Sequence, residues 1–189
     1  MPARPLSLEQ RQKIRETVLG LAVDHGFDGW RISDVIDQTG ISSRTLYKYY
    51  PSKEYLLLDA MIETASHMLA NLVDEAVAGK TPRVRVLRTL NSLTNALVGS
   101  PSSSRAMVRA LTCGQEAVAP MLRTFNNSMH LVVARAIAGG EPDDAEWDIA
   151  GIVQQVWFSA AISWAADIHG PEYMEESVIR VLHLIDKTG

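Results

Sequence analysis

The residues best suited to recognition chemistry lie between positions 40 and 55. This segment reads Gly-Ile-Ser-Ser-Arg-Thr-Leu-Tyr-Lys-Tyr-Tyr-Pro-Ser-Lys-Glu-Tyr, and residues 40–53 hold three cations and no acid. Guanidinium and ammonium groups can donate to guanine O6 and N7, and hydroxyl-bearing side chains can contact thymine. The segment therefore predicts contact with DNA.

Local signals place these side chains on a short helix. Gly40 and Ile41 form a turn after a helical pattern at 32–39, and a second short helix is expected at 43–50. Pro51 ends it, because proline disfavours helical geometry in the preceding residue. Ser52 then caps a long helix with Lys53 in its first turn. Two short helices joined by a glycine turn are the layout of a helix-turn-helix reader of the major groove.

The residues after the turn resemble the signature of the TetR family of bacterial regulators. The resemblance lies in Thr45-Leu46-Tyr47, the aromatic Tyr50 and the run Pro51-Ser52-Lys53-Glu54, and it extends back to about Leu8. It implies an all-helical homodimer that releases a palindromic DNA operator when a small molecule enters its C-terminal domain.

Two positions depart from the family pattern. The family usually has a capping hydroxyl residue where Arg31 stands and an alanine where Ile36 stands. With Arg31 in this place the helix lacks a side-chain cap worth about 1 kcal/mol, but the arginine can reach a phosphate. Ile36 is larger than alanine and is expected to alter the angle at which the two helices cross.

The candidate DNA contacts divide by role. The side chains expected at base edges are Ser43, Arg44, Thr45 and Lys48. The resemblance implies phosphate binding by Tyr47, Tyr49 and Lys53, with Arg31 and Ser33 clamping the adjacent backbone. The alternative, a plain solvated surface, is disfavoured by two exposed tyrosines on so short a helix. Leu46 and Tyr50 fall on the inner face and are expected in the core, as are Phe27 and Trp30.

Charge is unevenly divided along the chain of 189 residues. The net charge is −4, but residues 1–53 carry eight basic against six acidic residues, and the remainder carries ten against sixteen. A basic end that faces phosphate and an acidic end that points away fit this division.

Composition predicts a cytoplasmic protein without a cofactor, metal or catalytic site. Cys113 stands alone, so no disulfide framework is expected. The N-terminus lacks the apolar core of a signal peptide, and no transmembrane span is expected, residues 149–166 coming nearest. The five histidines are dispersed, and no phosphate-binding glycine loop or nucleophile elbow occurs.

The fold class predicted is all-α, because apolar residues recur at helical spacing and nowhere alternate as in a strand. About nine helices are expected, at 8–25, 32–39, 43–50, 52–78, 82–98, 102–112, 115–138, 143–168 and 171–187. The first three form a DNA-binding domain at 1–51, and residues 52–189 form a ligand-binding and dimerisation domain.

The C-terminal half resembles, more loosely, the ligand domain of actinobacterial TetR-type repressors of steroid and cholesterol catabolism. The resemblance lies in residues 133–142, Ile149-Ala150, Val156-Trp157-Phe158 and Ser163-Trp164-Ala165. Methionine-rich linings suit large hydrophobic ligands, although each such residue is individually more typical of a core. The candidate pocket residues are Met68, Asn95, Met107, Leu111, Met121, Phe125, Met129, Trp157, Ala161 and Trp164.

Small residues recur on the last two expected helices. Together with larger apolar neighbours, they could pack a four-helix homodimer interface, and packing within one chain is the alternative. The small residues are Ala150, Ala160, Ala161, Ala165 and Ala166, and the neighbours are Ile152, Val153, Val156, Val178, Val181 and Leu182. For the whole protein, the favoured interpretation is a ligand-responsive repressor. A carrier of hydrophobic ligands that merely retains the motif is the alternative, although it would have no use for Arg44, Lys48 and Lys53.

Overall fold

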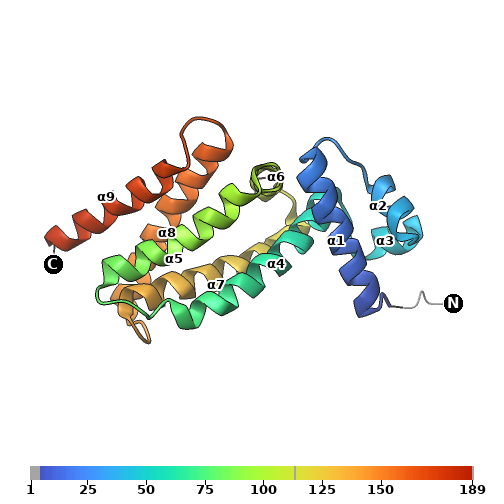
Figure 1. The fold of residues 1–189 in the computed structure, drawn as a ribbon. Coiled ribbons are helices and arrows are strands. Elements are labelled where there is room, and N and C mark those ends of the chain that lie inside the picture. The colour runs from blue at the N-terminus through green and yellow to red at the C-terminus, as the bar shows by residue number, and fades with distance from the viewer. Residues whose placement is uncertain (1–4, 113, 189) are drawn as a thin grey trace. The chain divides into compact units, whose positions relative to one another are not determined.

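The computed structural model describes residues 5–112 and 114–188, which form helices joined by short loops (Figure 1). No strand occurs in this part of the chain, so the all-α prediction is confirmed. The elements are α1 (Leu8–His25), α2 (Ile32–Thr39), α3 (Ser43–Tyr49), α4 (Lys53–Glu75), α5 (Pro82–Gly99), α6 (Pro101–Leu111), the 3-10 helix η1 (Glu116–Val118), α7 (Ala119–Ala138), α8 (Asp144–Ala165) and α9 (Glu172–Thr188).

Local sequence signals account for most helix ends. Ser7 caps α1 reciprocally with Gln10: the backbone N–H of each donates to the side-chain oxygen of the other. Asp143 and Glu146 repeat this capping box at α8. The helix predicted at 115–138 is corrected, because η1 precedes α7 and α7 begins only at Ala119. Pro120 lies in the first turn of α7, where its missing N–H costs no helical hydrogen bond.

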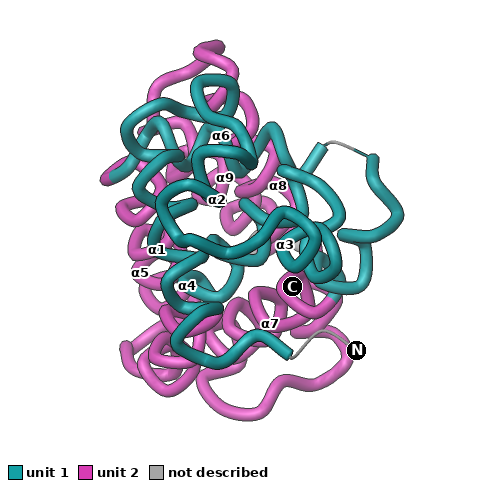
Figure 2. The backbone as a smooth tube through the Cα atoms, turned by 90° about the vertical axis from the view of Figure 1, so that its right-hand side faces the viewer, with its two compact units in different colours: residues 1–65, 100–123 teal, residues 66–99, 124–189 magenta. Residues whose placement is uncertain are grey.

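The chain divides into two compact units, each with its own core (Figure 2). Unit 1 comprises residues 1–65 and 100–123, and unit 2 comprises residues 66–99 and 124–189. This grouping follows contacts within each unit, so the predicted functional division into 1–51 and 52–189 stays a prediction.

Unit 1 is built around α1, which contacts both α2 and α6. The inward face of α1 carries Ile14, Val18, Leu21 and Ala22, as its helical spacing predicts. Trp30, Leu46 and Tyr50 are at most 2% exposed, which confirms their predicted place in the core. Phe27 is only partly buried, and this corrects its prediction as a core aromatic.

The core of unit 2 joins apolar side chains from the C-terminal part of α4 and from α5, α7, α8 and α9. Ala150, Ala160 and Ala161 are at most 2% exposed here, because α8 packs closely against its neighbours in the same chain. These three alanines are therefore covered by helices of their own chain, which corrects their assignment to a dimer face. Ala165 is partly buried and Ala166 is exposed, so their assignment stays a prediction. Ile152 on α8 and Leu184 on α9 are more than half exposed.

By length and apolar composition alone, α4 could cross a membrane, whereas residues 149–166, which came nearest in the sequence, do not meet these criteria. No other helix in the described part of the chain meets them. Core helices pass the same test. Asp59 and Glu63 lie along α4 and pair with Arg15 of α1, so we interpret this helix as part of a packed core.

A buried arginine fixes one end of unit 2. The guanidinium of Arg85 donates to the carbonyls of Ala136 at 2.8 Å, Ile137 at 2.7 Å and Gly79 at 3.2 Å. Two of these acceptors lie in the last turn of α7, where carbonyls have no intrahelical partner and a positive charge is favoured. Gly139 adopts φ +76°, and a Cβ there would meet the Arg85 guanidinium at 2.8 Å.

We expect Arg85→Ala to lower the free energy of unfolding by about 2–4 kcal/mol, since three carbonyls lose a charged donor inside the protein. Arg85→Lys should recover only part of this loss, because an ammonium lacks the planar fork. Urea denaturation followed by circular dichroism measures both. Arg83→Ala on the exposed side of α5 is the control, and an equal loss there would contradict the assigned role.

Candidate nucleic-acid interface

The connection between α2 and α3 is a tight glycine turn. Gly40 lies in the left-handed region at φ +71° and its N–H donates to the Ile36 carbonyl, which closes α2. Two residues later, Ser42 starts α3: its Oγ accepts the N–H of Thr45 at 3.2 Å and lies 2.8 Å from the Thr45 hydroxyl. The turn therefore presents α3 as a separately capped helix.

The start of α2 is capped by a residue that sequence reasoning missed. Arg31 has no side-chain oxygen to accept a hydrogen bond, but its backbone N–H donates to Asp34 Oδ2 at 2.7 Å. Asp34 also places a negative charge at the helix N-terminus, where the helix dipole favours it. The Arg31 side chain is exposed, as is that of Ser33.

The faces of α3 are clearly separated. Leu46 is fully buried and Tyr50, which follows the helix, is 2% exposed. Ser43, Arg44 and Lys48 are exposed, and Tyr47 is 50% exposed. Thr45 and Tyr49 are partly buried. Four of the six predicted contacts on α3 thus lie on an open surface, whereas the hydroxyl of Thr45 is engaged with Ser42.

Cations surround the ring of Tyr49. The guanidinium of Arg11 lies 5.4 Å from the ring centre and the ammonium of Lys48 lies 5.2 Å from it. Such placement is favourable because the face of an aromatic ring carries negative charge. Tyr49 thereby brings α1 and α3 cations to one surface, and Arg11 joins the predicted set as a residue that the sequence pattern did not single out.

Lys53, predicted to bind phosphate, starts α4 in an aromatic setting. Its Nζ lies 4.4 Å from the ring centre of Trp30 and 4.8 Å from that of Phe27, and it donates to the Trp30 carbonyl. Burial lowers the pKa of Lys53. An ammonium carries three N–H donors, so two remain beyond the bond to Trp30.

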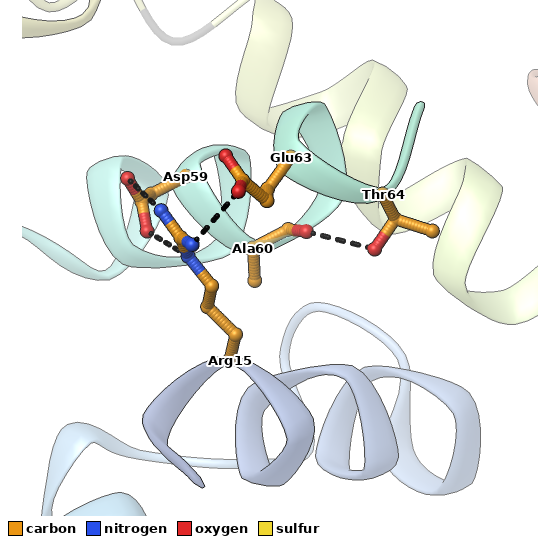
Figure 3. Close-up of polar contacts among 5 residues, drawn as sticks. All are labelled: Arg15, Asp59, Ala60, Glu63 and Thr64. Carbon is orange, nitrogen blue, oxygen red and sulfur yellow. Dashed lines mark hydrogen bonds and ion pairs between the residues drawn. The ribbon is translucent and has the colours of Figure 1, made fainter. Parts of the chain in front are cut away.

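Helix α4 is tied to α1 by an ion-pair cluster (Figure 3). Arg15 Nε donates to Asp59 Oδ2 at 2.9 Å, and Arg15 Nη1 lies 3.2 Å from Glu63 Oε1. The hydrogen bond to Asp59 raises the pKa of Arg15, while burial acts in the opposite direction. Because Asp59 and Glu63 are one turn apart on α4, a single guanidinium contacts two successive turns of that helix.

The predicted pocket residues fall in both units. Met107, Leu111 and Met121 belong to unit 1 and are partly buried, whereas the other seven belong to unit 2. Met129, Trp157, Ala161 and Trp164 are buried in the unit 2 core, and Asn95 is exposed. Trp157 Nε1 donates to Thr94 Oγ1 at 3.0 Å. Their assignment to a pocket stays a prediction.

Sequence comparisons match both halves of the chain. The profile described as "Bacterial regulatory proteins, tetR family" matches residues 14–60, and that described as "Tetracyclin repressor-like, C-terminal domain" matches residues 79–185. The HTH-type transcriptional repressor KstR of Mycobacterium tuberculosis is 30% identical over 82% of this chain and 71% of its own length. The KstR of Rhodococcus jostii is 26% identical over 82% and 73%.

Solved structures share the fold. A TetR transcriptional regulator from Rhodococcus sp. RHA1 superposes with a TM-score of 0.79 at 20% identity, covering 93% of this chain and 95% of that one. The TetR-family repressor FadR of Thermus thermophilus, in complex with lauroyl-CoA, gives a TM-score of 0.70 at 20% identity and covers 92% of each chain.

The cap at Ser42 should stabilise the protein. We expect Ser42→Ala to cost about 1 kcal/mol of unfolding free energy, because the Thr45 N–H loses its acceptor. Ser42→Asp should keep the stability, since its carboxylate can accept the same bond. Thermal melts measure both, with Ser43→Ala as the matched control at the exposed neighbouring serine. Equal melting temperatures for Ser42→Ala and the wild type would contradict the cap.

Proposed function

Because the chain belongs to the tetR family of bacterial regulatory proteins, we propose that it is a transcriptional repressor that releases its operator on binding a hydrophobic small molecule. The observation that carries this proposal is the exposed face of α3. Arg44 and Lys48 are open to solvent on a helix whose opposite face is held in the core by Leu46. Cations on an exposed helix after a tight turn suit entry into a major groove.

We assign the contacts by side-chain chemistry. Base edges are contacted by Ser43, Arg44, Thr45 and Lys48, and phosphates by Arg31, Ser33, Tyr47, Tyr49 and Lys53. The exposure of Arg44 and Lys48 supports bonding to guanine. The position of Lys53 at the N-terminus of α4 supports phosphate binding, since helix N-termini attract anions.

The proposed active form is a homodimer in the cytoplasm. Two copies of α3 about 34 Å apart would enter successive major grooves of a palindromic operator. Ile152 on α8 and Leu184 on α9 are large apolar side chains exposed to solvent, which supports a dimer face on these helices. An effector that binds better to a misspaced dimer would shift the equilibrium away from DNA.

The proposed effector is steroid-like or acyl-CoA-like and binds in the C-terminal domain. The resemblance of residues 133–165 to steroid-catabolism repressors supports the first class. The lauroyl-CoA bound to the Thermus FadR supports testing the second. The pocket would be lined by the predicted methionine and tryptophan residues and would include Ala161.

The two classes of DNA contact should respond differently to mutation. We expect Arg44→Ala and Lys48→Ala to relax base preference at particular operator positions, by about 1–3 kcal/mol for each base contact. Selection of sites from random DNA compares the consensus sequences of the wild type and both variants. If both variants select the same consensus sequence as the wild type, Arg44 and Lys48 do not read bases.

Lys53→Ala should weaken binding on every sequence alike. It should also reduce the slope of log affinity against log salt by about 0.9 for each lost phosphate contact. Fluorescence anisotropy of labelled duplexes at several salt concentrations measures this slope. A protein that binds lauroyl-CoA or a steroid but no DNA would instead be the hydrophobic-ligand carrier.

Effector binding should perturb tryptophans on α8. We expect lauroyl-CoA or a steroid to change tryptophan fluorescence and raise the melting temperature, because a ligand of the folded state stabilises it. Ala161→Phe should abolish this response and leave DNA binding intact. Ala145→Phe, the same change at an exposed position of α8, is the control. If Ala161→Phe unfolds the protein while Ala145→Phe does not, Ala161 serves the core and the pocket assignment is wrong.

A further inference from the structure

Residues 100–123 belong to unit 1 although they follow α3 by some fifty positions (Figure 2). One side chain of this segment, Gln115, reaches the start of α4. Ser52 Oγ donates to Gln115 Oε1 at 2.6 Å, and Gln115 Nε2 donates to Glu54 Oε2 at 2.8 Å. Gln115 thus bonds to both residues that flank Lys53, and we call this set (Ser52, Glu54 and Gln115) the glutamine bridge.

The bridge controls the cap of α4. Ser52 Oγ also accepts the backbone N–H of Tyr55 at 3.1 Å, so Ser52 is the N-cap of α4. A serine hydroxyl has one hydrogen to donate. Because that hydrogen points at Gln115, the oxygen lone pairs are left facing the helix. Gln115 therefore fixes the rotation of the capping hydroxyl.

Glu54 is held in its charged form by the same contacts. Burial raises the pKa of Glu54, but hydrogen bonds from its own backbone N–H and from Gln115 lower it, and the net shift is downward. The carboxylate beside Lys53 thus keeps a defined position and a full charge. The neutral amide of Gln115 donates to the Glu54 carboxylate without adding another cation beside Lys53.

A second residue of the segment, Arg109, lies near the same aromatic ring as Lys53. Arg109 pairs with Asp28, and its guanidinium lies 4.9 Å from the ring centre of Phe27. The ammonium of Lys53 lies 4.8 Å from the same ring. The proximity of Arg109 also contributes to lowering the pKa of Lys53. Two residues of the same segment therefore contact the neighbours of Lys53: Arg109 lies over Phe27, and Gln115 bonds to Ser52 and Glu54.

We propose that Gln115 is a positioning residue for DNA binding, which holds Lys53 at the phosphate-facing start of α4 without touching DNA itself. This inference rests on the proposed function, because Lys53 is a phosphate contact only if the chain binds DNA. Loss of the bridge frees Ser52 and Glu54 to move, and Lys53 between them loses its fixed position.

Affinity for a duplex taken from the DNA upstream of its own gene tests the proposal. Gln115→Ala should weaken binding roughly three- to tenfold, as expected for two lost hydrogen bonds. The exposed neighbour Glu116 supplies the control variant, Glu116→Ala. Removing an acid can only favour DNA through long-range charge, so weaker binding in Glu116→Ala as well would overturn a specific role for Gln115.

A donor–acceptor exchange separates positioning from general stability. Gln115→Glu alone sets two carboxylates against each other and should weaken binding. Combining it with Glu54→Gln restores one donor and one carboxylate at the same net charge, and should recover wild-type affinity. Failure of this double variant to recover, with both proteins folded by circular dichroism, would overturn the proposal even if Gln115→Ala proves unstable.

A double-mutant cycle tests the route through Lys53. The loss caused by Gln115→Ala should largely disappear in a Lys53→Ala background, because the group being positioned is absent. An undiminished loss would show that Gln115 acts elsewhere. A wild-type protein that binds neither this duplex nor random DNA would overturn the proposed function, whereas a DNA-binding wild type with an unaffected Gln115→Ala would overturn this inference alone.

Discussion

The junction between α3 and α4 is the constraint on which the reading surface depends. Helix α3 has seven residues, far fewer than an isolated helix needs to be stable in water. Its stability must therefore come from what adjoins it. Leu46 and Tyr50 anchor it in the core, Ser42 caps its start, and Pro51 ends it before α4 begins. Because α4 is itself tied to α1 through Arg15, the position of α3 is set from both of its ends.

Two cations, the buried Arg85 and the partly buried Lys53, serve different purposes in the two units. In unit 2, the guanidinium of Arg85 donates to three backbone carbonyls, and two of these lie at the C-terminal end of α7, where partial negative charge gathers. In unit 1, Lys53 lies over two rings and bonds to a single carbonyl, which leaves donors for a further partner. The first arrangement engages all three guanidinium nitrogens and stabilises the fold. The second holds an ammonium in place while leaving part of its bonding capacity unused, which is what a preformed anion contact requires.

The helices of the DNA-binding motif could be predicted from the sequence because the signals that define them act over short distances along the chain. Gly40, Pro51 and the 3.6-residue period locate α2 and α3 and place Leu46 inward, because each signal acts within one or two turns. The contacts of Gln115 and Arg109, and those of Arg85 with α7, span 50 or more positions and follow no local period, so nothing in the spacing reveals them. The alanines of α8 illustrate the intermediate case. Their period identifies an inward face, but only the folded chain shows that α8 meets neighbours of its own unit there.

The charges at the start of α4 show why a neutral bridge is suited to this place. A helix N-terminus attracts anions, and Glu54 lies where it can compete with a phosphate for that field. A cationic partner for Glu54 would neutralise it but would also add a long side chain beside Lys53 and an ordering cost of its own. Gln115 instead donates to Oε2 of this carboxylate from a neutral amide. Lys53 is then left as the cation of the first turn, with its direction set by Trp30 and its flanking residues set by one glutamine.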